Sequence, residues 1–131
     1  MKKDILGEED IKLLVNNFYD RVKKDDIIGF IFHDIIGEDW SHHLPVMYTF
    51  WGTILLNKQG YKGNVIQKHI DIDKKITLQK EHYDRWIFLW QKTVDDLFEG
   101  DKAEEAKNRA SLMIQLISMK VDWSRLNNSI Q

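Results

Sequence analysis

The single proline and the seven glycines of this 131-residue chain are the feature that most constrains its fold. Proline and glycine interrupt regular structure, so their scarcity leaves long uninterrupted tracts. Within these tracts apolar residues recur at intervals of three and four, which is the period of a helix with one buried face. We therefore expect an all-α protein.

The first half of the chain predicts two full helices. Residues 8–24 form one amphipathic tract, and acidic residues at its start suit the positive end of the helix dipole. A second helix is expected over residues 41–56. Pro45 must lie in its first turn, because proline lacks an amide hydrogen and clashes with the turn before it. Residues 25–37 predict only a turn or two of helix, followed by a loop.

The second half of the chain predicts a long loop and then two more helices. Residues 57–75 have mixed polarity and no sustained period, so we expect a loop with at most one short turn at 65–69. Thr77 can cap a helix that ends at Gly100, and Asp101 can cap the last helix.

The length fits one domain over residues 1–131, with a polar tail from about residue 124 that should fray from Asn127. Nineteen basic and 21 acidic residues give a net charge of -2, which leaves no basic surplus for nucleic acid. No signal-peptide pattern and no uncharged stretch of about 18 residues occurs. We expect a soluble, cytoplasmic protein with no nucleic-acid or membrane partner.

The chain has no cysteine, which excludes disulfides, thiolate-bound metals and cysteine nucleophiles. A metal would need histidine or carboxylate ligands, and no His-Glu-x-x-His spacing of a zinc protease is present. The five histidines are His33, His42, His43, His69 and His82. We expect surface roles for His33 and His82. His69 stands out because it sits at the end of the long loop between two amphipathic helices, where a ligand to a prosthetic group could project into the core.

Large aromatic residues are numerous for so small a helical chain, and core packing accounts for most of them. It accounts poorly for Tyr19, directly after Phe18 on the apolar stripe of the first helix, and for His43 at a helix start. A buried hydroxyl or imidazole group needs a hydrogen-bond partner. A pocket that holds a polar diatomic ligand would supply that partner.

Seven short motifs follow one another in unbroken order between about residues 11 and 115. They are Phe18-Tyr19-x-x-Val22, Ile28-Gly29-x-Ile31-Phe32, Trp40-x-x-His43-Leu44-Pro45-x-Met47-x-x-Phe50-Trp51, Tyr61-x-Gly63, His69, His82-Tyr83-x-x-Trp86-x-x-Leu89 and Gly100-x-x-Ala103. In this order they resemble the truncated haemoglobins, specifically those of group III.

The resemblance implies a two-over-two helical sandwich around haem b, with His69 as the proximal iron ligand. It implies distal positions for Tyr19, His43 and Trp86, and it implies that Phe32 packs on the porphyrin. Such an iron binds oxygen, carbon monoxide and nitric oxide. The Tyr19 hydroxyl and the Trp86 indole are hydrogen-bond donors that would slow the loss of bound oxygen.

Two functions stay open on this resemblance. The first is an oxygen-binding or scavenging protein. The second is a redox enzyme, either a nitric oxide dioxygenase or a peroxidase-like enzyme, and it would need an external reductase because the chain has no Gly-x-Gly-x-x-Gly fingerprint. His43 could gate the pocket, donate a hydrogen bond or bind iron, and Lys68 could pair with a haem propionate. A helical interaction module without haem is the remaining alternative.

Overall fold

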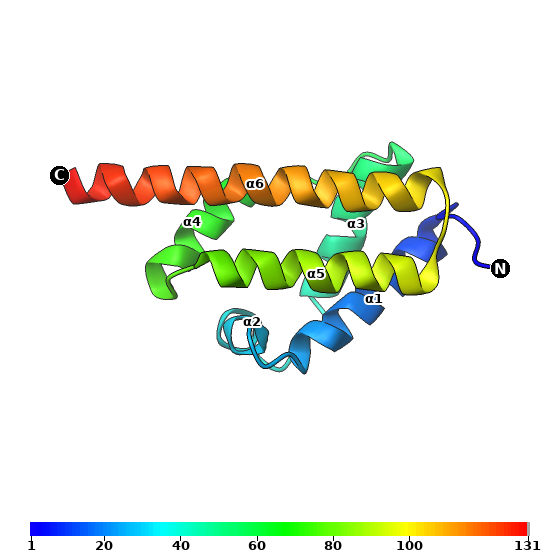
Figure 1. The fold of residues 1–131 in the computed structure, drawn as a ribbon, viewed down its shortest axis with the longest axis horizontal. Coiled ribbons are helices and arrows are strands. Elements are labelled where there is room, and N and C mark those ends of the chain that lie inside the picture. The colour runs from blue at the N-terminus through cyan, green and yellow to red at the C-terminus, as the bar shows by residue number, and fades with distance from the viewer. Residues whose placement is uncertain (131) are drawn as a thin grey trace.

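The computed structural model describes the backbone of residues 1–130 and the side chains of residues 1–127, and this part of the chain contains six helices and no strand. The helices are α1 (Glu8–Lys23), α2 (Gly29–Ile36), α3 (His43–Leu56), α4 (Val65–Lys75), α5 (Lys80–Leu97) and α6 (Asp101–Ile130). α5 and α6 run antiparallel in front of α1 and α3 (Figure 1). α1 contacts both α3 and α5, which joins the two pairs into a two-over-two sandwich. The predicted all-α class is confirmed.

The first three helices follow the sequence prediction closely. α1 covers the first amphipathic tract, and α2 is the expected short helix of eight residues. α3 begins at His43, so Pro45 lies in its first turn, where the missing amide hydrogen has no partner to lose.

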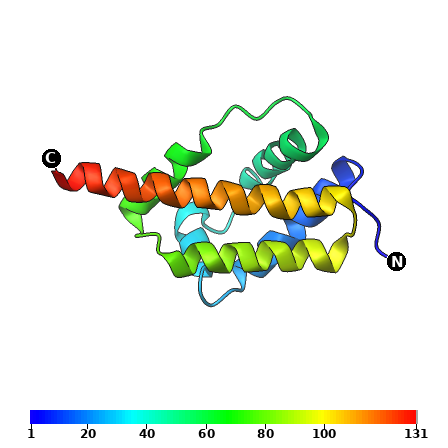
Figure 2. The same ribbon diagram turned by 45° about the horizontal axis from the view of Figure 1, so that its top comes forward.

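Helix α4 corrects the prediction that residues 57–75 are almost entirely loop. It has 11 residues, and the Asn64 side chain caps it by accepting a hydrogen bond from the Gln67 backbone N–H at 3.0 Å. Only residues 57–64 remain irregular, and they arch from α3 to α4 (Figure 2). None of the α4 residues is fully buried, and contacts with α6 support the helix.

The start of α5 also differs from the prediction that Thr77 caps it. The helix begins at Lys80, after the capping residue Gln79. The Gln79 backbone N–H donates to His82 Nδ1 at 3.0 Å, so a histidine side chain completes this cap.

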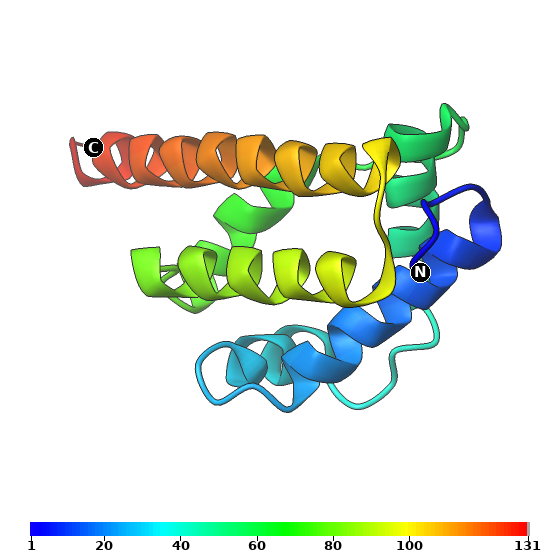
Figure 3. The same ribbon diagram turned by 45° about the vertical axis from the view of Figure 1, so that its right-hand side comes forward.

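The N-terminus of α6 is capped from the other end of the chain. The Asp4 carboxylate accepts hydrogen bonds from the backbone N–H groups of Lys102 and Ala103, both at 2.9 Å, and the segment before α1 lies beside the turn from α5 to α6 (Figure 3). Gly100 has a φ of +139°, and a side chain there would collide with Asp4. The prediction that Asp101 caps α6 is therefore wrong, because Asp101 is the first residue of the helix itself.

We expect Asp4→Ala to lower the free energy of unfolding by about 1–2 kcal/mol, because α6 loses the acceptor for two of its first N–H groups. Urea titrations at pH 7 measure this loss. Asp101→Ala is the control and should cost much less, because its carboxylate caps nothing. Equal losses for the two variants would contradict the capping role of Asp4.

Low pH should remove the contribution of Asp4 to the free energy of unfolding. Burial raises the pKa of Asp4, but hydrogen bonds from the backbone N–H groups of Lys102, Ile5 and Ala103 outweigh it and hold the pKa below its usual 3.8. A carboxyl whose pKa is lower in the folded state stabilises fully above its unfolded pKa, and this stabilisation disappears as the pH falls through the folded value. The difference between wild type and Asp4→Ala should therefore shrink below about pH 4.

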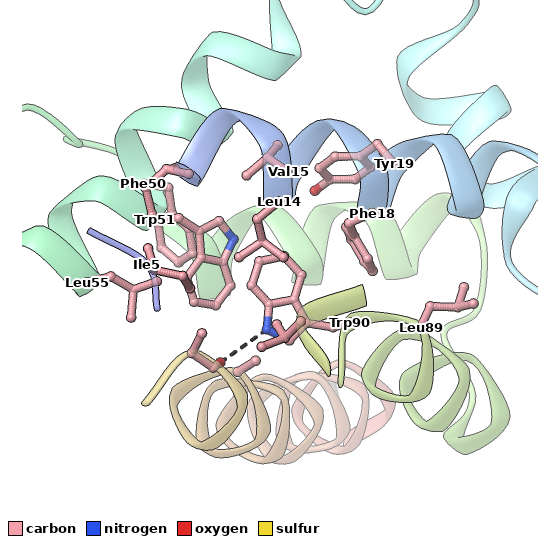
Figure 4. Close-up of a cluster of buried hydrophobic side chains, with 14 of the residues drawn as sticks. Ile5, Leu14, Val15, Phe18, Tyr19, Phe50, Trp51, Leu55, Leu89 and Trp90 are labelled. Carbon is pink, nitrogen blue, oxygen red and sulfur yellow. Dashed lines mark hydrogen bonds between the residues drawn. The ribbon is translucent and has the colours of Figure 1, made fainter. Parts of the chain in front are cut away.

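Aromatic rings from three helices form the centre of the core (Figure 4). Trp51 on α3 stacks on Trp90 on α5 with ring centroids 4.3 Å apart, and Phe18 on α1 meets Trp90 edge-on at 5.0 Å. The Trp90 indole N–H donates to the Ala106 carbonyl on α6 at 3.1 Å. These contacts fix α5 against its neighbours, and α5 carries three of the residues that line the cavity described below.

Helix α6 continues through the polar tail, where we expected fraying from Asn127, and it reaches Ile130; Gln131 lies outside the described residues. Across the described part of the chain, no helix combines the length and the apolarity needed to cross a membrane.

Candidate functional site

A cavity of about 540 Å³ lies among α1 to α5, and side chains of α6 also reach it. Its volume falls in the range of ligand and cofactor pockets, and most of its lining is apolar. The five side chains that the sequence singled out all line it, and each comes from a different helix, in the order α1 to α5. They are Tyr19, Phe32, His43, His69 and Trp86.

His69 presents a free ring nitrogen to this cavity. Its Nδ1 lies 2.8 Å from the Val65 carbonyl oxygen, one turn earlier in α4. A carbonyl only accepts, so Nδ1 carries the hydrogen and Nε2 keeps its lone pair. Burial lowers the pKa of His69, although the hydrogen bond to Val65 opposes this effect. A neutral imidazole with an oriented ring is the form that binds a metal.

The Tyr19 side chain is buried, but its hydroxyl has no protein partner among the described residues. The residue is 5% exposed, and the side chains of residues 1–127 offer its hydroxyl no hydrogen bond. Its ring packs against Phe32, Trp40 and His43, with centroids 5.9, 5.2 and 5.5 Å away. Burial raises the pKa of Tyr19, so the hydroxyl keeps its hydrogen and remains a donor.

His43 is the second polar group without a partner. Its Nε2 is buried and makes no hydrogen bond to the described residues. Burial lowers the pKa of His43, and the nearby charges of Lys68 and His42 lower it further, so the ring is neutral at pH 7. His42 is exposed, as expected, although it also lines the cavity, and it is His43 whose Nε2 is buried there.

Helix α5 contributes Trp86 and, one turn earlier, Tyr83. Trp86 stacks on Trp90 with an interplanar angle of 10°, and its indole N–H has no partner among the described side chains. The Tyr83 hydroxyl is buried and also unpaired, and burial raises the pKa of Tyr83 to about 12. The sequence pattern included Tyr83 in a motif with Trp86 but did not predict it as a site residue. The signal that could have identified Tyr83 is its position three residues before Trp86, because residues three apart lie on the same face of a helix.

The surface role expected for His82 is wrong, because the residue is buried and accepts the Gln79 N–H in the cap of α5. His33 is exposed, as expected, and its ring lies 3.0 Å from the Lys23 carbonyl. Lys68 is also exposed and lines the cavity at its surface.

The polar tail fixes the helix that carries His69. Arg125 donates to the Asp73 carboxylate from Nε at 2.9 Å and from a terminal guanidinium nitrogen. Asp73 also accepts from the Leu78 backbone N–H at 2.8 Å, and its side chain is only 10% exposed. One carboxylate therefore ties the end of α4 to α6 and to the segment before α5.

Comparison with known proteins identifies the family. A group 3 truncated haemoglobin from Campylobacter jejuni is 30% identical to this chain over 121 residues, which covers 90% of each sequence. The chain belongs to the group 3 truncated haemoglobins. The crystal structure of a group III truncated haemoglobin from Campylobacter jejuni matches with a TM-score of 0.84 at 25% identity, covering 92% of this chain and 95% of that one. No protein-family model matches the sequence.

A truncated haemoglobin is a globin-type haem-binding protein, and the cavity suits this cofactor. Its apolar walls match a porphyrin, and His69 carries a neutral ring nitrogen of the kind that binds iron. Unpaired buried polar groups are rare in folded proteins because they cost free energy, yet His43 Nε2 and the Tyr83 hydroxyl are both buried without a partner among the described residues, and both residues line this one cavity. Such a set is typical of a pocket that receives a polar ligand.

Proposed function

We propose that this truncated haemoglobin holds haem b through His69 Nε2 and binds oxygen, carbon monoxide and nitric oxide. The observation that carries the proposal is the pairing, in one apolar cavity, of a neutral histidine with hydrogen-bond donors that have no protein partner. Haem supplies an iron atom that accepts the proximal histidine and a diatomic gas.

The residues around the cavity have different roles in binding the gas and the haem. The Tyr19 hydroxyl and the Trp86 indole N–H donate hydrogen bonds to a polar ligand and slow its release. Phe32 packs on the porphyrin, and its own ring is positioned by Tyr19 and by Trp40, which stacks on it at 6.3 Å. Lys68 is exposed and lines the cavity, and its ammonium group suits the charge of a haem propionate.

The direct test starts from the purified chain loaded with haem and reduced. We expect one haem per chain and reversible spectral changes with oxygen and with carbon monoxide. A chain that takes up no haem, or whose spectrum does not change when either gas is added, would contradict the proposal. Sustained formation of nitrate from nitric oxide, driven by an added reductant, would instead favour the redox enzyme.

We expect His43 to gate the cavity, so His43→Leu should change the association rate of oxygen more than its dissociation rate. The ring begins α3, directly after the irregular segment from Gly37 to His42, and the His42 side chain makes no capping hydrogen bond. A side chain at such a helix start can swing more readily than one in mid-helix. Flash photolysis measures association, and stopped-flow mixing measures dissociation.

Two results would contradict the gating role of His43. If His43→Leu changes only the dissociation rate, His43 is a direct hydrogen-bond donor. If the reduced wild type is six-coordinate without added ligand and the variant is five-coordinate, His43 binds iron at rest. His33→Leu provides the control, because His33 is exposed and does not line the cavity, so both rates should stay within about twofold of wild type.

We expect Arg125→Ala to speed haem loss several-fold, because α4 loses the anchor that positions His69. Arg125→Lys should recover only part of the effect, since lysine keeps the charge but not the two-pronged geometry. Transfer of haem to an excess of apomyoglobin measures the rate. Asp122→Ala is the control, because Asp122 also pairs with Arg125 at 3.6 Å but is exposed and does not touch α4. Equal rates of haem loss from Arg125→Ala and Asp122→Ala would contradict the role of Arg125 in anchoring α4.

A further inference from the structure

Helix α6 carries two apolar stripes on opposite faces. The inner stripe packs in the core and consists of Ala103, Ala106, Ala110, Ile114, Ile117 and Val121. The outer stripe consists of Leu112, Leu116, Met119 and Trp123, which are between 45% and 66% exposed. The sandwich uses only the inner stripe, so the outer one has no part in the globin fold described above.

The position of α6 leaves this outer stripe accessible. The C-terminal end of α6 extends past α4 and past the start of α5, as two different views show (Figures 1 and 2). A helix that projects into water gains little from its own hydrogen bonds, and most helical stability in proteins comes from burying an apolar face. Covering the outer stripe would therefore stabilise this end of α6.

The spacing of the outer stripe indicates what covers it. Its residues follow one another at intervals of four, three and four, and Leu126 continues the series at an interval of three. This average period of 3.5 residues is the seam of a coiled coil, in which each side chain packs between residues of a facing helix. The same spacing on a second α6 is the complementary surface.

We propose that the outer stripe of α6 binds the outer stripe of a second copy of this chain and forms a symmetric dimer. Five large apolar side chains, each about half exposed, offer on the order of 500 Å² per chain, so a pair would bury about 1,000 Å², near the lower limit for a specific interface. Trp123, 64% exposed, is the kind of residue that dominates such interfaces.

The charges beside the stripe favour a protein partner over an anionic membrane. Lys120 and Asp122 flank it on the same turn and cancel each other, and Gln115 is neutral. Helices that lie on anionic lipid need a surplus of lysine and arginine beside the apolar face. The net charge of -2 is also too small to keep two copies apart.

Sedimentation velocity of the haem-loaded chain over about 10–200 μM tests the proposal. We expect wild type to approach twice 15.6 kDa as the concentration rises, and the Leu116→Glu/Trp123→Glu double variant to remain at the monomer mass. Leu13→Glu is the matched control, because Leu13 is 47% exposed on α1, and it should dimerise like wild type. Circular dichroism and haem content should be the same for all three proteins.

A crosslinking experiment does not depend on how the double variant folds. The chain has no cysteine, so Met119→Cys introduces a single thiol at the centre of the stripe. Mild oxidation with copper phenanthroline should link Met119→Cys into a dimer and leave Leu13→Cys mostly monomeric. A wild type that stays monomeric over the whole range, equal crosslinking of both cysteine variants, or monomers that sediment with phosphatidylglycerol vesicles would overturn the proposal.

Discussion

Replacing His69 with glycine should remove stable haem from the protein. His69 Nε2 is the nitrogen that we assign to iron, and its Nδ1 bond to Val65 holds the ring in the orientation and tautomer that coordination needs. His69 is the one histidine of α4. We expect the purified variant to carry well under about a tenth of the haem of wild type, measured from the Soret absorbance per chain.

Two further measurements make this result specific. Added imidazole should restore part of the haem binding in His69→Gly, because glycine leaves room for a free ring where the side chain stood. His33→Gly is the matched control, since His33 is exposed and lies outside the cavity, and it should keep its haem. A His69→Gly protein with full haem and an unchanged five-coordinate ferrous spectrum would reject the ligand assignment.

Tyr19→Phe and Trp86→Phe should each raise the dissociation rate of oxygen. Each variant removes one donor while keeping an aromatic ring in the cavity. A neutral hydrogen bond contributes about 0.5–1.5 kcal/mol and one to a charged acceptor about 1.5–3 kcal/mol. We therefore expect increases of about threefold to tenfold or more. Stopped-flow displacement of oxygen by carbon monoxide measures the rate.

The dissociation rate of carbon monoxide distinguishes a loss of hydrogen bonding from a steric effect. It is less polar when bound, so its dissociation rate should respond less than that of oxygen to both variants. Tyr48→Phe is the matched control, because the Tyr48 hydroxyl donates to Asn16 on an exposed surface and should have no influence. Equal responses of the two gases would show that Tyr19 and Trp86 shape the pocket without donating to the ligand.

The sequence was sufficient for features that depend on local pattern. Apolar residues at helical spacing predicted α1, α3, α5 and α6, because a helix that buries one face must repeat them with its own period. The order of short motifs then singled out five cavity residues on five helices, and these do meet in one cavity. His69 was found in this way although its helix was not, since a loop was expected there.

The features that the sequence did not determine join residues that are far apart in the chain. Asp4 caps a helix that begins 97 positions later, and Arg125 anchors Asp73 across 52 positions. The unpaired hydroxyl of Tyr83 is also a tertiary property, because its neighbours come from other helices. Spacing along one segment reports which face of that segment is buried, but a polar side chain has a partner only when the fold brings one within about 3 Å. Periodicity thus determined α1, α3, α5 and α6 of this globin, whereas packing between distant segments decided how its proximal helix is held and which donors face the cavity.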